Sequence, residues 1–203
     1  MIGRRSIVVA SLLACLPVQG RAQSSLVLAD GESLQGRFVQ QRFLQGFNQP
    51  LKSTGSFVLS PGRGVAWLGE TPFVTTTVIG PGGLAQRVSG ATTVYPASRL
   101  PVIATLYDIF ASALSGDWQK LAAMFDVRRE SGAEWTVILT PRQAGNAGMP
   151  ISTVTVRGSR YVDGVEVRRT NGDWDSIEFS QQVPSRQPVS AETAELFAAV
   201  ARR

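Results

Sequence analysis

Apolar and polar residues alternate along most of the chain from Leu34 onward, a pattern typical of antiparallel strands that are buried on one face. In Gly55–Leu59, for example, Phe57 and Leu59 point to one face and Val58 points to the other. Turns rich in glycine and proline separate such runs. The predicted strands are Gly36–Leu44, Gly55–Leu59, Val65–Leu68, Phe73–Ile79, Leu84–Val88, Glu134–Thr140, Ile151–Arg157, Gly164–Thr170 and Asp173–Gln181. The dipeptides Asp163-Gly164 and Asn171-Gly172 predict tight hairpin turns between the last strands.

Three segments have helical features instead. In Pro101–Leu114, apolar residues recur at the spacing of an amphipathic helix. A shorter helix is predicted for Trp118–Phe125, with Asp117 as its N-cap. The chain closes with a predicted helix over Ser190–Arg203. These elements indicate an α+β fold, in which one large, curved antiparallel sheet carries helices on one face.

The first residues have the features of a secretory signal peptide, residues 1–22. Arg4 and Arg5 precede an apolar run that is too short to span a membrane, and small residues lead to a cleavage site after Ala22. The remainder, residues 23–203, has the length of a single domain. The only cysteine, Cys15, has two interpretations: a small apolar residue of the signal peptide, or the acylated cysteine of a sequence that resembles a lipobox. The cleavage site at Ala22 favours the first.

Composition narrows the classes of function. The chain has 20 basic and 15 acidic residues, and removal of Arg4, Arg5 and Arg21 with the signal peptide leaves 17 basic ones. This near balance argues against binding to nucleic acid, which depends on clustered positive charge. The chain has no histidine, and after cleavage at Ala22 it has no cysteine. Histidine-based triads, thiol catalysis and metal sites built from these residues are therefore excluded.

Carboxylates are the remaining candidates for catalysis. Asp173, Asp175 and Glu178 lie close together near a predicted hairpin, and glycosidases use paired carboxylates. Acidic residues beside an Asn-Gly turn are more often solvated hairpin tips. The glycine-rich stretch Gly80–Gly83 lacks the Gly-Lys-Ser/Thr ending of a phosphate-binding loop. We therefore expect a protein that is not an enzyme and that needs no cofactor and no metal.

Several segments follow one another in a characteristic order. They are Phe38–Arg42, Gly55–Leu59, the strand with Trp67, Thr71-Pro72-Phe73, Ser115–Gln119 and Trp135–Arg142. Their order and spacing resemble the LolA family of periplasmic lipoprotein carriers. Phe43–Phe47 with Pro50-Leu51 is closer to LolA-like proteins that are encoded beside exporters of lipid-linked or polyene products. The resemblance implies an incomplete antiparallel β-barrel, with a helical lid on its apolar concave face.

The resemblance also implies a cavity for acyl chains. Its lining is expected to include Phe57, Trp67, Phe73, Trp135, Val137, Val154, Val167, Ile177 and Phe179. The expected lid is the helical segment Val102–Leu114, with Leu106, Ile109, Phe110 and Leu114 toward the cavity. Arg63 lies nearest to the place where the family has an arginine that controls lid opening, and it is the candidate for that role. The alternative for the apolar residues is ordinary core packing between sheet and helices, and the alternative for Arg63 is a solvated arginine of a turn.

The expected function follows from the resemblance. It is that of a monomeric carrier in the periplasm of a Gram-negative bacterium, which shuttles acylated lipoproteins or related lipids toward the outer membrane. Its expected partners are an inner-membrane exporter and an outer-membrane acceptor. Two alternatives remain open: an outer-membrane receptor that is acylated at Cys15 and resembles LolB, or a carrier of a glycolipid or polyene product that works with an envelope exporter.

Overall fold

A computed structural model describes residues 28, 31–99, 107, 109, 121–130, 132, 134–142 and 150–201. In this part of the chain, 11 antiparallel strands form a single sheet, and one helix, α3 (Ala191–Ala199), is complete. The strands are β1 (Ser33–Phe43), β2 (Leu51–Ser60), β3 (Gly64–Thr71), β4 (Thr75–Gly80), β5 (Gly83–Val88), β6 (Ala91–Pro96), β7 (Phe125–Glu130), β8 (Trp135–Pro141), β9 (Ile151–Gly158), β10 (Val162–Arg169) and β11 (Trp174–Ser185).

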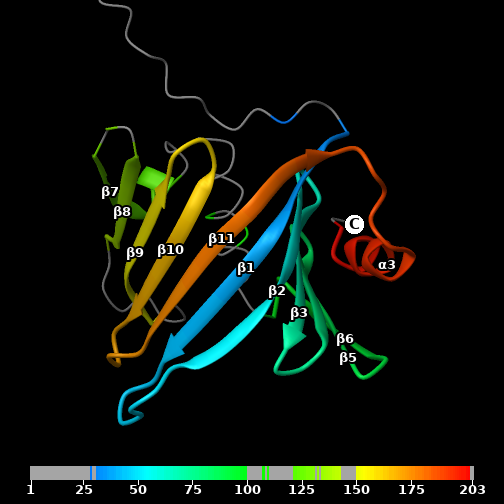
Figure 1. Ribbon diagram of the computed structural model, residues 1–203, viewed down its shortest axis with the longest axis horizontal. Helices are drawn as coiled ribbons and strands as arrows, with labels where there is room; N and C mark the ends of the chain where they lie inside the picture. The colour runs from blue at the N-terminus through cyan, green and yellow to red at the C-terminus, as the bar shows by residue number, and fades with distance from the viewer. Residues whose placement is uncertain are drawn as a thin grey trace, which may run out of the picture.

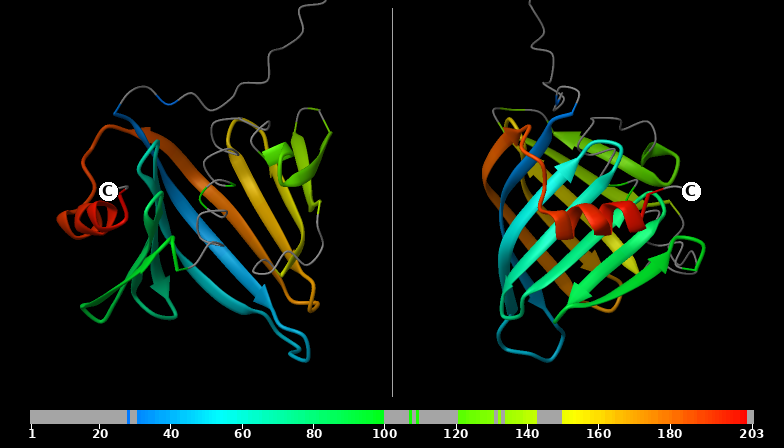
Figure 2. Two further views of the ribbon diagram at one scale, coloured as in Figure 1. Left: turned by 180° about the vertical axis from the view of Figure 1, so that it is seen from behind. Right: turned by 90° about the vertical axis from the view of Figure 1, so that its right-hand side faces the viewer.

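The sheet is built outward from a central pair, β1 and β11. Its strand order is β6-β5-β4-β3-β2-β1-β11-β10-β9-β8-β7, so the first half of the chain forms one side and the second half the other. The two sides bend toward each other about the central pair (Figures 1 and 2). The edge strands β6 and β7 are not paired with each other, so the described sheet stays open. This confirms the predicted fold class, an incomplete antiparallel β-barrel.

The strands of the first half carry apolar side chains on both faces. On β3, Val65 and Trp67 point to the concave face, whereas Ala66 points to the outer face. Helix α3 covers that outer face, where Leu196 and Phe197 pack with Ala66 and its neighbours (Figure 2). The prediction that all helices lie on one face is therefore wrong for α3. Small side chains on the outer face leave an apolar surface that requires its own cover.

Glycines allow the end of α3 to come close to the sheet. The Gly82 N–H donates to the Val200 carbonyl oxygen at 2.8 Å. A Cβ on Gly82 would lie 2.8 Å from the same oxygen, and a Cβ on Gly80 would lie 2.6 Å from a Val200 methyl carbon. At the other end, Ser190 caps the helix as predicted, because its Oγ accepts from the Thr193 N–H at 3.2 Å.

Two strands were not expected from the sequence. Strand β6 is exposed along its whole length and lacks apolar alternation, although the β-branched and aromatic run Thr92–Tyr95 favours a strand. Strand β7 begins at Phe125, where a helix over Trp118–Phe125 was predicted to end. Of the predicted helix Pro101–Leu114, only Tyr107 and Ile109 lie among the described residues, and both are helical.

The two predicted hairpin turns differ in outcome. Asn171-Gly172 forms a turn, with Gly172 at a φ of 87°. The turn prediction at Asp163-Gly164 is wrong, because Gly164 lies inside β10 and pairs with Glu178. The register shifts between Val162 and Gly164, so this dipeptide marks an irregularity of the strand.

Candidate functional site

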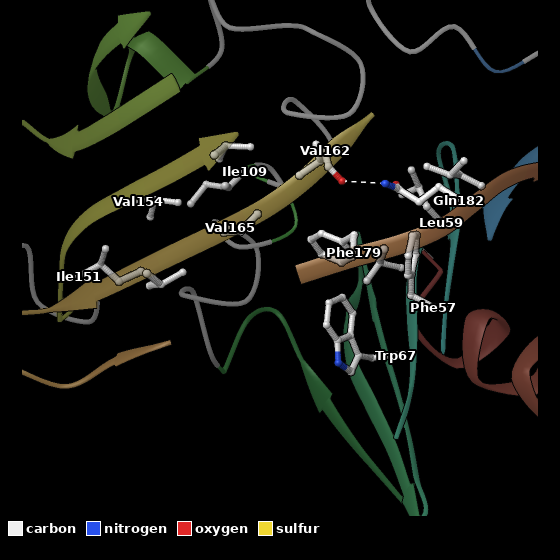
Figure 3. A pocket seen from close by; sticks show the side chains of 14 residues that line it. Phe57, Leu59, Trp67, Ile109, Ile151, Val154, Val162, Val165, Phe179 and Gln182 are labelled. Carbon is white, nitrogen blue, oxygen red and sulfur yellow. Dashed lines mark hydrogen bonds between the residues drawn. The ribbon is translucent and has the colours of Figure 1, made fainter. Parts of the chain in front are cut away.

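An apolar cavity lies on the concave face between the two sides of the sheet (Figure 3). It encloses about 70 Å³. Its lining residues are Leu34, Phe57, Leu59, Val65, Trp67, Ile109, Ile151, Val154, Val156, Val162, Val165, Val167, Phe179 and Gln182. Apart from Trp67, which has an indole N–H, Gln182 is the only residue of this lining with a polar side chain. Its Nε2 donates to the Val162 carbonyl oxygen at 2.9 Å. The cavity therefore suits an apolar ligand.

One wall of the cavity is aromatic. The Phe57 and Phe179 rings meet edge to face, with centroids 5.2 Å apart, and Trp67 meets Phe179 in the same way at 5.8 Å. Phe38 packs behind them, with its ring centroid 4.4 Å from that of Trp67. Edge-to-face pairs of this kind contribute roughly 0.5–1.5 kcal/mol each beyond the area that they bury.

Glycines opposite these rings hold the aromatic wall close to the sheet. Gly36 pairs with Phe57, and a Cβ on Gly36 would lie 2.6 Å from the Phe57 ring. Gly55 pairs with Phe38, and a Cβ on Gly55 would lie 2.9 Å from the Phe38 ring. Each ring can therefore lie across its partner strand, in space that a larger residue would fill.

The opposite wall is aliphatic. It is made by β-branched side chains of β9 and β10, among them Val154, Val156, Val165 and Val167, which have few rotamers. Ile109 packs against this wall and is only 7% exposed. A residue of the predicted lid is thus in contact with the cavity.

The cavity leaves about 70 Å³ of open space between its two apolar walls, which suits an acyl chain or a similar apolar ligand. Among the predicted lid residues that the structure describes, Ile109 lies at this cavity.

A polar cluster borders this apolar surface. Asp175 on β11 is 3% exposed and accepts from Gln40 Nε2 at 3.0 Å and from Arg42 Nε at 2.8 Å. Arg169 Nη2 donates to the other carboxylate oxygen. Burial raises the pKa of Asp175, but the hydrogen bonds from Arg42, Gln40 and Arg169 outweigh it, so the pKa lies below its ordinary value. The prediction that Asp175 is a solvated hairpin tip is wrong.

Asp173 does lie at the hairpin tip. It accepts from the Gln45 backbone N–H at 2.9 Å and from Asn171 Nδ2 at 2.9 Å, and these bonds lower its pKa. Among the described residues, no group of three or more His, Cys, Asp or Glu side chains is placed to hold a metal ion. None of the helices described is both long and apolar enough to cross a membrane.

The predicted cavity residues fall into two groups. Phe57, Trp67, Val154, Val167 and Phe179 line the cavity. Val137 and Ile177 are buried but do not reach its surface, and Trp135 is half-buried, with its indole N–H donating to the Ser159 carbonyl oxygen at 2.8 Å. Among the predicted lid residues, Leu106, Phe110 and Leu114 lie outside the described part of the chain.

Phe73 does not belong to the site, which corrects the prediction from sequence. It lies in the connection between β3 and β4 and is 75% exposed, because β4 begins only at Thr75. Replacement of Phe73 with serine is therefore expected to leave the affinity for an acyl ligand unchanged. The free energy of unfolding should change by no more than about 0.5 kcal/mol. Ligand titration and urea denaturation of this variant check both statements.

Arg63 lies on the outer side of the sheet in this state. Its guanidinium carbon is 4.9 Å from the centre of the Phe197 ring on α3, a cation–π contact. Its role in gating the lid stays a prediction.

Several cavity residues were missed in the analysis of the sequence. They are Leu34, Leu59, Val65, Ile151, Val156, Val162, Val165 and Gln182. For some of them the signal was present, because residues two apart on a strand share a face. Leu59 follows Phe57 in this way, Val65 precedes Trp67, and Val165 precedes Val167.

Comparison with known proteins gives the family. Residues 17–183 match the family model described as outer membrane lipoprotein carrier protein LolA-like. The chain belongs to this LolA-like family. None of the curated proteins compared with it matches.

Solved structures show distant likeness. One is from the complex of Pseudomonas aeruginosa MucA and MucB, at 16% identity and a TM-score of 0.45, with 80% of this chain and 55% of the matched chain covered. The present chain thus spans about half the length of that relative. Another is a LolA superfamily protein from Nitrosomonas europaea, at 8% identity and a TM-score of 0.43, with 80% of this chain and 90% of that one covered. The family assignment rests on the sequence match.

Proposed function

We propose that the protein is a periplasmic carrier that binds the acyl chains of lipoproteins or related lipids in the concave cavity and delivers them toward the outer membrane. Membership of a family of lipoprotein carriers supports this proposal. The observation that carries it is the apolar cavity between an aromatic and an aliphatic wall, in a sheet that remains open. The carrier is not an enzyme and works without a cofactor.

A carrier has to bind its cargo and also release it. Each methylene withdrawn from water is stabilised by about 0.8 kcal/mol, so a carrier must offer apolar surface comparable to a membrane. A covering segment that fills the empty cavity would compete with the ligand and lower the apparent affinity, which favours release. The contact of Ile109 with the aliphatic wall supports this part of the proposal.

Mass spectrometry of protein purified from the periplasm of its host tests the function directly. We expect a mature chain that begins at Gln23, with an acyl species bound under native conditions and lost under denaturing ones. A chain that begins at an acylated Cys15 would instead identify an anchored receptor. Protein that never carries a lipid, and that binds none in vitro, would contradict the proposal.

The mass of the bound species also separates the remaining alternatives. An acylated polypeptide identifies a lipoprotein cargo, whereas a glycolipid or polyene mass identifies a product of an envelope exporter. The inner-membrane exporter and the outer-membrane acceptor belong to the proposal as expected partners. Crosslinking of the periplasmic protein in its host would identify them.

A further inference from the structure

We propose that Arg42 and Arg169, held in place by Asp175, bind the anionic headgroup of an amphiphile whose acyl chain occupies the cavity. This inference rests on the proposed carrier function and adds the class of cargo, a lipid with a phosphate or carboxylate head.

The cluster and the cavity share the concave face of the sheet. Asp175 pairs with Arg42 on one side and with Val167 on the other, and directly paired residues point to the same face. Val167 lines the cavity. Ile151, which also lines the cavity, pairs with Arg169. The polar cluster therefore borders the cavity on the concave face, beside Val167 and Ile151.

Both guanidinium groups retain hydrogen-bond donors for a ligand. Arg169 Nη1 is buried and has no hydrogen-bond partner among the residues that the structure describes. An unsatisfied buried donor is costly and requires an explanation. Arg42 contacts Asp175 through Nε, and its side chain is 46% exposed. Asp175 thus orients two arginines without satisfying all their donors.

The arginines of the cluster are not paired one to one with acidic residues. Both contact the buried carboxylate of Asp175. Asp173 is hydrogen-bonded to the Gln45 backbone N–H and to Asn171, and it interacts with both arginines through its charge. On the outer face of the same strands, by contrast, Arg37 has Glu70 as its own partner. Guanidinium groups are well suited to phosphate and carboxylate oxygens, which accept two parallel hydrogen bonds.

The distance along the sheet fits an acyl chain. Leu34, at the far end of the cavity, is eight positions before Arg42 on β1. At roughly 3.3 Å per residue, these positions are about 26 Å apart. One leaflet of a bilayer's hydrocarbon core is about 15 Å thick. The concave face between the arginines and Leu34 is therefore longer than the acyl layer of one leaflet.

Titration with three ligands of equal chain length tests the inference: tetradecyl phosphate, tetradecanoate and the neutral tetradecanol. Trp67 in the cavity wall provides a fluorescence signal for all three. We expect the unmodified protein to bind at least one anionic ligand about tenfold more tightly than the alcohol, the effect of one charge-assisted hydrogen bond. The stronger of the two anions identifies the head as a phosphate or a carboxylate.

Variants then locate the effect. Arg169→Gln and Arg42→Gln should each reduce the preference for the anion while the affinity for tetradecanol stays the same, which also shows that the cavity is intact. Arg37→Gln is the matched control, because it removes an arginine of β1 from the outer face and should leave the preference unchanged.

The outcomes separate the two proposals. Equal affinities for the anions and the alcohol, or a preference that survives both variants, would overturn the headgroup site and leave the carrier function standing. Failure of the unmodified protein to bind any of the three ligands would overturn both.

Discussion

Replacement of Asp175 with asparagine is expected to lower the free energy of unfolding by about 3 kcal/mol, because it leaves two arginines without their shared buried carboxylate. Asp175 is 3% exposed and accepts hydrogen bonds from three side chains on two other strands, Gln40 and Arg42 on β1 and Arg169 on β10. Strands β1, β10 and β11 meet at this residue, at the centre of the sheet. Urea denaturation of the two proteins at neutral pH measures the difference.

Glu178→Gln is the matched control for this change. Glu178 lies on the same strand and forms an ion pair with Arg157, but both side chains are 50% exposed. Exposed pairs of this kind contribute about 0–1 kcal/mol. If both variants lost the same amount of stability, burial of the Asp175 cluster would not be the source of the effect.

The same contact predicts a dependence on pH. The pKa of Asp175 is lowered in the folded state, so the unfolded state binds a proton at higher pH than the folded state does. The stabilisation is complete above the unfolded pKa of about 3.9 and is lost as the pH falls through the folded pKa. The stability gap between the natural protein and Asp175→Asn should therefore narrow below about pH 4. A gap that stayed constant down to about pH 2 would contradict this assignment.

The alternation of residues was sufficient to predict the sheet but not all its edges. Strands with one apolar face, such as the one with Phe57 and Leu59, were found because burial imposes a period of two. Strand β6 has no buried face and therefore no period of two, so its β-branched and aromatic run Thr92–Tyr95 was its one signal. The position of α3 also required the structure, because the small residues Ala66 and Ala85 indicate neither which face is covered nor by what.

The candidate site shows the same limit. Aromatic residues on predicted strands indicated one wall of the cavity, and Phe73 was misplaced because the turn before β4 is longer than the sequence pattern suggested. The polar cluster was missed for a different reason. Asp175 lies beside a hairpin, where carboxylates are usually exposed, and Arg42 is 133 positions away in the chain. Only the pairing of β1 with β11 brings them together.

A larger side chain at Val165 is expected to block the cavity and to weaken the binding of acyl ligands by between tenfold and a hundredfold. Val165 is half-buried and lines the cavity on β10, next to about 70 Å³ of empty space that a phenylalanine ring can enter. To bind, an acyl chain must then displace the ring, whose burial is worth roughly 1.5–3 kcal/mol. That free energy corresponds to the loss of affinity given above.

Val183→Phe provides the control for this substitution. Val183 lies on the neighbouring strand β11, is 56% exposed and is not part of the cavity lining, so the same change there should leave binding unaffected. Thermal unfolding of both variants establishes that they are folded before the titration. If Val165→Phe bound a tetradecyl ligand as tightly as the natural protein, the ligand would lie elsewhere on the sheet. If binding were lost only in Val165→Phe, the acyl chain would be located in the cavity between the two walls.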